Sequence, residues 1–157
     1  MYFPELKAPR TSNRLARLME LYESNYLLMR LLIPRLKDLD EDCYVSTQQG
    51  CVDLRLEILE RCKYTTTLKL TYNFSRGSGK TSEPDLVIRI YHDARTAEAM
   101  SGLIHGKRHE QRRVRDLDEG WILNRFLYKW IKYCLLRGHR FSGLPDTAKL
   151  SPELAYS

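Results

Sequence analysis

The stretch Val87-Ile88-Arg89-Ile90-Tyr91-His92-Asp93-Ala94 decides the fold of this chain. Its strict alternation places Ile88 and Ile90 on one face of a β-strand, and Arg89 and Tyr91 on the other. Asp is typical of turns, and Asp93-Ala94 is therefore predicted to form a two-residue turn. A further strand follows over residues 95–104, so the segment predicts an antiparallel hairpin.

The hairpin also predicts a register and a candidate surface. A two-residue turn at this point places Arg89 directly opposite Glu98. Opposite charges that face each other across a ladder favour one register by about 0.2–1 kcal/mol. We therefore take the polar side chains of the hairpin as a candidate surface for a ligand or partner; they are Arg89, Tyr91, His92, Asp93 and Glu98.

The rest of the chain extends this hairpin into an α+β fold. Apolar residues at helical spacing predict a helix that ends before Pro34 and a second helix that ends at Gly138. We expect a five-stranded antiparallel meander with these N-terminal and C-terminal helices packed on one face. Its strands are predicted at residues 43–48, 52–58, 64–74, 85–92 and 95–104. Residues 1–10 are expected to be a loose arm, 11–138 a single domain, and 139–157 a polar tail.

Composition limits the class of protein. The chain has 157 residues, of which 43% are hydrophobic and 29% charged, as is typical of globular domains. It contains no apolar run near the roughly 20 residues of a membrane-spanning helix, and no secretory signal begins it. The four cysteines show no C-x-x-C spacing, so we expect reduced thiols and predict neither a metal nor a cofactor. A cytoplasmic protein is the expectation.

Positive charge is concentrated after the hairpin. The chain has 26 Lys and Arg against 20 Asp and Glu, a net charge of +6. Residues 105–115 contain a single acid, Glu110, among five basic side chains, which makes this segment a candidate site for an anion or a nucleic acid. The five are Lys107, Arg108, Arg112, Arg113 and Arg115.

Four stretches together resemble the YqiB-like family of uncharacterised bacterial proteins. They are residues 23–26 with 31–34, Lys63-Tyr64-Thr65-Thr66, residues 87–94 with Ala97-Glu98, and Asn124 with Phe126-Leu127, Trp130, Tyr133-Cys134-Leu135 and Gly138. The resemblance covers about residues 15–138 and implies a bacterial, single-domain, intracellular protein. It implies no activity, and the nucleotide-related setting of the family's genes is the one hint of a ligand.

Three functions fit these patterns. The first is a non-enzymatic interaction module that binds a protein or an anionic, nucleotide-like ligand through the hairpin surface and the adjoining basic segment. The second is an RNA- or DNA-binding protein that uses the basic segment. The third is a hydrolase or phosphodiesterase with His92, Asp93 and Glu98 in its site, although neighbouring residues on a strand point to opposite faces.

Overall fold

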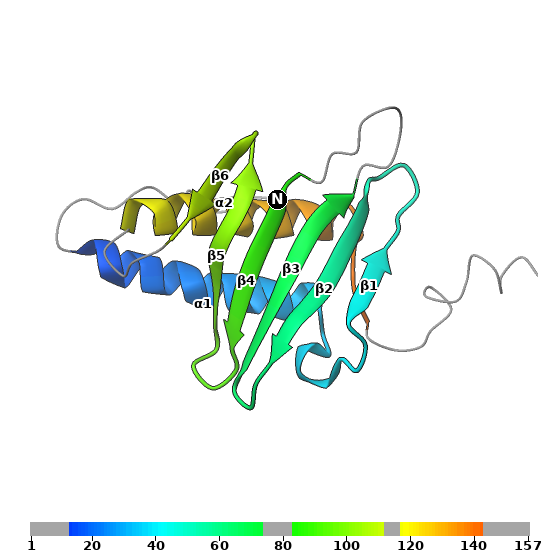
Figure 1. Cartoon of the computed structure of the whole chain (residues 1–157), viewed down its shortest axis with the longest axis horizontal. Helices are drawn as coiled ribbons and strands as arrows, with labels where there is room; N and C mark the ends of the chain where they lie inside the picture. The colour runs from blue at the N-terminus through cyan, green and yellow to red at the C-terminus, as the bar shows by residue number, and fades with distance from the viewer. Residues whose placement is uncertain (1–12, 74–82, 112–116, 143–157) are drawn as a thin grey trace, which may run out of the picture.

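The computed structural model describes residues 13–73, 83–111 and 117–142, so the predicted N-terminal arm lies outside the described residues. The described residues form one antiparallel sheet with the strand order β1-β2-β3-β4-β5-β6, together with two α-helices and a short 3-10 helix (Figure 1). The elements in chain order are α1 (Arg14–Leu32), η2 (Leu36–Asp38), β1 (Cys43–Ser46), β2 (Asp53–Arg61), β3 (Thr65–Asn73), β4 (Asp85–Tyr91), β5 (Thr96–Ile104), β6 (Lys107–Glu110) and α2 (Leu117–Leu136). The predicted α+β fold with an antiparallel meander is confirmed, but the sheet has six strands where five were predicted.

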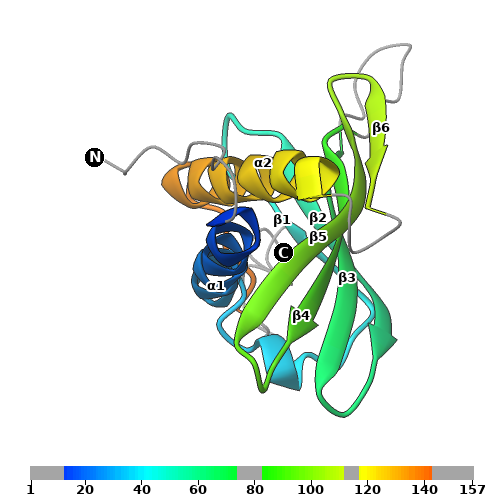
Figure 2. The ribbon, with the colours of Figure 1, turned by 90° about the vertical axis from the view of Figure 1, so that its left-hand side faces the viewer.

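Both α-helices cover one face of the sheet (Figure 2). Alternate residues of the central strands point toward them, and in β4 these are Leu86, Ile88 and Ile90, all fully buried. Burying one such side chain contributes about 1.5–3 kcal/mol, so the layer between sheet and helices is the core of the domain. No helix within the described ranges is long and apolar enough to cross a membrane.

The β4–β5 hairpin has the predicted register but a longer turn. Arg89 lies directly opposite Glu98, as predicted. The turn takes in all residues from His92 to Arg95, and the Arg95 N–H donates to the Tyr91 carbonyl at 2.8 Å. Arg95 adopts the left-handed conformation with φ 58°. The register is unchanged because the turn is longer by one residue on each side.

The sixth strand is the difference between the predicted sheet and the observed one. His105 and Gly106 form the turn before it, with φ values of 51° and 77°. Two positive φ values are typical of the tight turns that join hairpin strands. Within β6 only His109 is buried, so no apolar alternation marks the strand in the sequence.

A buried polar cluster joins the helices to β5. The Ala99 N–H donates to Asn124 Oδ1 at 2.7 Å, and Asn124 Nδ2 donates to the Ala99 carbonyl at 3.3 Å. Asn25 of α1 donates to Asn124 Oδ1 at 3.4 Å. Both asparagines are fully buried. Because buried amides need hydrogen-bond partners, this cluster holds α1, α2 and β5 in one arrangement.

The C-terminal end of α2 is closed as the sequence predicts. Gly138 adopts φ 94°, and the His139 N–H donates to the Cys134 carbonyl at 3.0 Å, a bond typical of a glycine-capped helix. His139 and Phe141 are then buried, so packed residues extend past the predicted domain boundary at Gly138. The rest of the predicted tail, residues 143–157, lies outside the described residues.

Candidate functional site

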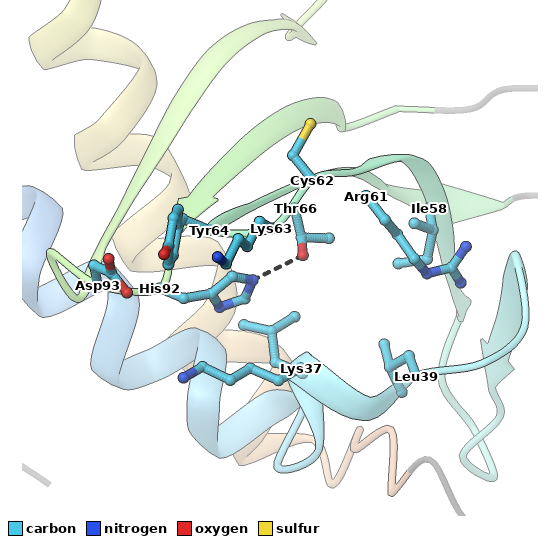
Figure 3. A pocket seen from close by; sticks show the side chains of 11 residues that line it. Lys37, Leu39, Ile58, Arg61, Cys62, Lys63, Tyr64, Thr66, His92 and Asp93 are labelled. Carbon is cyan, nitrogen blue, oxygen red and sulfur yellow. Dashed lines mark hydrogen bonds between the residues drawn. The ribbon is translucent and has the colours of Figure 1, made fainter.

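A pocket of about 440 Å³ opens at one end of the sheet (Figure 3). It lies where η2, the β2–β3 turn and the β4–β5 turn meet, because alternate turns of a meander lie at the same end of the sheet. Its size is within the roughly 300–1,000 Å³ typical of small-molecule sites. The residues that line it are Leu36, Lys37, Leu39, Ile58, Arg61, Cys62, Lys63, Tyr64, Thr66, His92 and Asp93.

His92 is the central polar group of this pocket. Its side chain turns toward β3, where its Nε2 lies 2.8 Å from Thr66 Oγ1 (Figure 3). Its own N–H donates to the Tyr64 carbonyl at 2.9 Å, which ties the β4–β5 turn to the start of β3. Only 8% of the residue is exposed, and its Nδ1 is buried with no hydrogen-bond partner among the described residues. A buried imidazole nitrogen without a partner is rare, and it marks a position where a ligand atom can bind.

Cations outnumber carboxylates around the pocket. Lys37, Arg61 and Lys63 line it together with a single acid, Asp93. Arg61 is already paired, with its guanidinium 2.9 Å from a carboxylate oxygen of Asp42. No ion pair within the described part of the chain involves Lys37 or Lys63. Two ammonium groups therefore remain to meet a negatively charged ligand.

These charges act on the imidazole. Burial lowers the pKa of His92 below its usual value of 6.5, and the positive charges of Lys37 and Arg30 lower it further. The carboxylate of Asp93 opposes this shift in the pKa without cancelling it. His92 is thus neutral at pH 7 and lies in a region of positive potential, the potential that attracts an anion.

The rim of the pocket offers an aromatic ring and a thiol. Tyr64 is 51% exposed, and the ammonium of Lys63 lies 5.1 Å from the centre of its ring. Cys62 beside them is an exposed free thiol. A half-exposed tyrosine next to a cationic cavity can hold a planar group by stacking while the cations bind its charge.

Only two of the five residues of the predicted hairpin surface belong to this pocket. His92 and Asp93 line the pocket, whereas Arg89, Tyr91 and Glu98 are not among its lining residues. Glu98 accepts a hydrogen bond from the phenol of Tyr22 at 3.1 Å. The set proposed for hydrolysis is therefore not assembled, since Glu98 is bound at a helix and not beside the imidazole. Among the described residues no hydrogen bond joins His92 to Asp93 either, so no described carboxylate orients the ring as a general base requires.

The predicted basic segment is only partly described. Lys107 and Arg108 lie in β6, exposed, and at the end of the sheet opposite the pocket (Figure 1). Arg112, Arg113 and Arg115 fall outside the described residues. Residues that could jointly hold a metal ion, as three or more His, Cys, Asp or Glu side chains, are not found in the ranges that the structure describes.

Sequence reasoning missed the cations of the pocket. Lys37 and Lys63 are far apart in the chain, and neither lies in a segment for which a site was predicted. The one available signal was Lys63-Tyr64-Thr65-Thr66, a stretch that carries the family resemblance and also supplies three lining residues. Only the meander brings this stretch, η2 and His92 together.

Comparison with known proteins gives a family and no activity. A protein-family model described as "Protein of unknown function (DUF1249)" matches residues 27–140. The chain is 32% identical over 126 residues to a protein of Escherichia coli strain K12 named "Uncharacterized protein YqiB", covering 77% of this chain and 88% of that protein. Proteins of the same name from E. coli O6:H1 and O157:H7 match with the same identity and coverage. No solved structure matches the chain.

Proposed function

The chain belongs to the family described as "Protein of unknown function (DUF1249)", and we propose that it is a non-enzymatic binding protein for a small phosphate-bearing anion. The pocket around His92 is the proposed site. The observation that carries this proposal is the unpartnered, buried Nδ1 of His92 in a cavity with two unpaired ammonium groups. Among the described residues, the Nδ1 of His92 and the ammonium groups of Lys37 and Lys63 all lack a negatively charged hydrogen-bond acceptor, and a phosphate oxygen supplies one.

The proposed ligand carries a planar group beside its phosphate. Lys37 of η2 and Lys63 of the β2–β3 turn both line the pocket and would contact the charge of the ligand. The exposed ring of Tyr64 offers a face for a base, and the cavity of about 440 Å³ is large enough for a nucleoside monophosphate. A nucleotide-like ligand therefore fits better than a simple inorganic anion.

A binding role fits this site better than catalysis. The Nε2 of His92 is held by the hydroxyl of Thr66, and no carboxylate in the described part of the chain is hydrogen-bonded to the ring. Protonation of His92 adds a donor and a positive charge, both useful for holding an anion. Without such a hydrogen-bonded carboxylate the imidazole is not set up as a general base, so its proposed role is to bind the ligand.

Calorimetric titration of the full chain at low salt tests this proposal. The probes are AMP, inorganic phosphate and adenosine, and we expect AMP to bind most tightly because it carries both groups. Lys37→Ala and Lys63→Ala should each weaken AMP binding about three- to tenfold, since each removes one charge-assisted contact. Lys69→Ala is the matched control, because it removes the same charge from the middle of β3.

Two results would contradict the proposal. One is the absence of any binding heat with AMP and with phosphate at low salt. The other is an equal loss of affinity in Lys107→Ala, which would move the anion site to the basic segment at the opposite end of the sheet.

A further inference from the structure

A second hollow lies at the other end of the molecule, between α2 and the tip of the β5–β6 hairpin. Its volume is about 500 Å³. Aromatic side chains make up much of its wall, namely Trp121, Phe126, Trp130 and Tyr133 of α2. Trp121 and Trp130 are buried in the domain, whereas Tyr133 remains 51% exposed, so part of this aromatic surface is not covered by the core.

Three rings at the groove contact one another in a row, those of His105, Phe126 and Trp130. The ring of Phe126 lies 6.0 Å from that of Trp130, and the exposed imidazole of His105 meets Phe126 edge-on at 6.0 Å. Ile122, one turn before Phe126 on α2, is 43% exposed. Large apolar groups that stay half-exposed along one side of a helix mark a binding surface more than a packing surface.

The groove is also positively charged. Arg125 and Lys129 line it from α2, and none of the described residues that line it is acidic. Their backbone positions are one helical turn apart, about 6 Å along the axis. The Nε of Arg125 is buried and has no hydrogen-bond partner within the described residues. In the sequence, three further arginines come directly before α2, at positions 112, 113 and 115.

From this arrangement we infer that the groove between α2 and the β5–β6 hairpin binds single-stranded nucleic acid. Unpaired bases stack on Tyr133 and Phe126, and the phosphates of the strand meet Arg125 and Lys129. Aromatic rings interleaved with cations are the chemistry of single-strand recognition. A single strand presents phosphates and bases in alternation, as the groove presents cations and rings along α2, and an acidic protein partner is an alternative outcome of the test below.

Fluorescence anisotropy with the full chain tests this inference. The probe is a fluorescein-labelled oligothymidylate of about 12 nucleotides, within the usual site size of such grooves. Tyr133→Ala should weaken binding about fivefold or more, whereas Tyr133→Phe should retain it, because the ring and not the hydroxyl stacks. Lys129→Gln should reduce the slope of log affinity against log salt by about one. Leu27→Ala, which truncates a 58% exposed side chain on α1, is the matched control and should bind as the parent protein does.

Each contrary outcome overturns the inference. They are no binding of the single strand at low salt, equal binding of the matching duplex, and loss of binding in Leu27→Ala as large as in Tyr133→Ala. Stronger binding of an acidic polypeptide than of the oligonucleotide, lost in Tyr133→Ala, would assign the groove to a protein partner instead. Circular dichroism of each variant separates loss of binding from loss of fold.

Discussion

Arg89 and Glu98 face each other across β4 and β5, yet each side chain bonds to a third residue. Arg89 Nε donates to the hydroxyl of Thr67 on β3 at 3.2 Å. Glu98 accepts from Tyr22 of α1 at 3.1 Å. Burial raises the pKa of Glu98, while the hydrogen bond from Tyr22 and the charge of Arg89 act against this rise. Arg89 and Glu98 are therefore register partners, but the ion pairs among the described residues do not include one between them.

The first prediction concerns this carboxylate. Because the folded pKa of Glu98 is raised, the folded state holds its proton more tightly, and stability falls as pH rises above about 4.5. Glu98→Gln keeps an acceptor for Tyr22 and removes the charge. We expect its melting temperature to match or exceed that of the parent at pH 7, with a difference that grows from pH 4.5 upward. Thermal unfolding at several pH values measures the difference in melting temperature between the variant and the parent. A difference that is smaller at pH 7 than at pH 4.5 contradicts the prediction.

The second prediction concerns Gly102 in β5. A Cβ atom at this position would lie 2.0 Å from Leu86 Cδ2 and 2.7 Å from the Asp85 carbonyl oxygen. The backbone atom cannot move aside, so Gly102→Ala should lower the free energy of unfolding by about 1–3 kcal/mol. Urea denaturation measures the loss. Ser101→Ala is the control next to it on the same strand, and its change should stay within about 0.5 kcal/mol.

The third prediction concerns the asparagine cluster. Asn124→Ala leaves the Ala99 N–H and carbonyl without side-chain partners and costs about 3 kcal/mol or more, because each buried unpaired group costs about 1–3 kcal/mol. Asn25→Ala should cost less, since its bonds to Asn124 are longer, at 3.3 and 3.4 Å. A double-mutant cycle should give a coupling of about 0.5 kcal/mol or more between the two positions. Strict additivity would show that the two amides act separately.

The fourth prediction concerns pH and anion binding. His92 is neutral at pH 7, because burial and the neighbouring cations lower its pKa below 6.5. A bound anion stabilises the protonated ring, so binding takes up a proton and affinity rises as pH falls below neutrality, by up to about tenfold per pH unit. Sulfate is the suitable probe, since its own charge stays constant in this range. Titration by NMR of the His92 ring signals gives the effect, and His92→Gln should abolish the pH dependence. A flat profile for the parent protein would remove His92 from the site.

The strands with apolar alternation were predictable from the sequence. β2, β3 and β4 each alternate apolar with polar residues over much of their length, as Leu54, Leu56 and Ile58 do in β2, so their period followed from elementary geometry. The register predicted for β4 against β5 followed from the turn that joins them. β6 was missed because Lys107-Arg108-His109-Glu110 has no apolar residue to report its period. Its pairing depends on the turn at His105–Gly106 and on the edge of β5 that it joins, which are properties of the folded chain.

The candidate site was predictable only in part. The strand-end position of His92 and Asp93 marked them in the sequence, and both line the pocket. The sequence reading expected their side chains to diverge as on a regular strand, whereas His92 is already the first residue of the turn and bonds to Thr66. Lys37 carried no signal, because its approach to His92 depends on how η2 packs against two distant turns.

The two hydrogen bonds between Asn124 and the backbone of Ala99 affect which partners can bind at the edge of the sheet. Next along β5, the Met100 carbonyl is taken up by the N–H of Gln111, and β6 continues the pairing from Ser101. From Ala99 onward, the N–H and C=O groups on this edge of β5 are thus already hydrogen-bonded. A strand from another chain cannot pair with them to extend the sheet. A partner that binds at this edge must therefore contact side chains. Two copies of the chain cannot pair edge to edge along this part of β5.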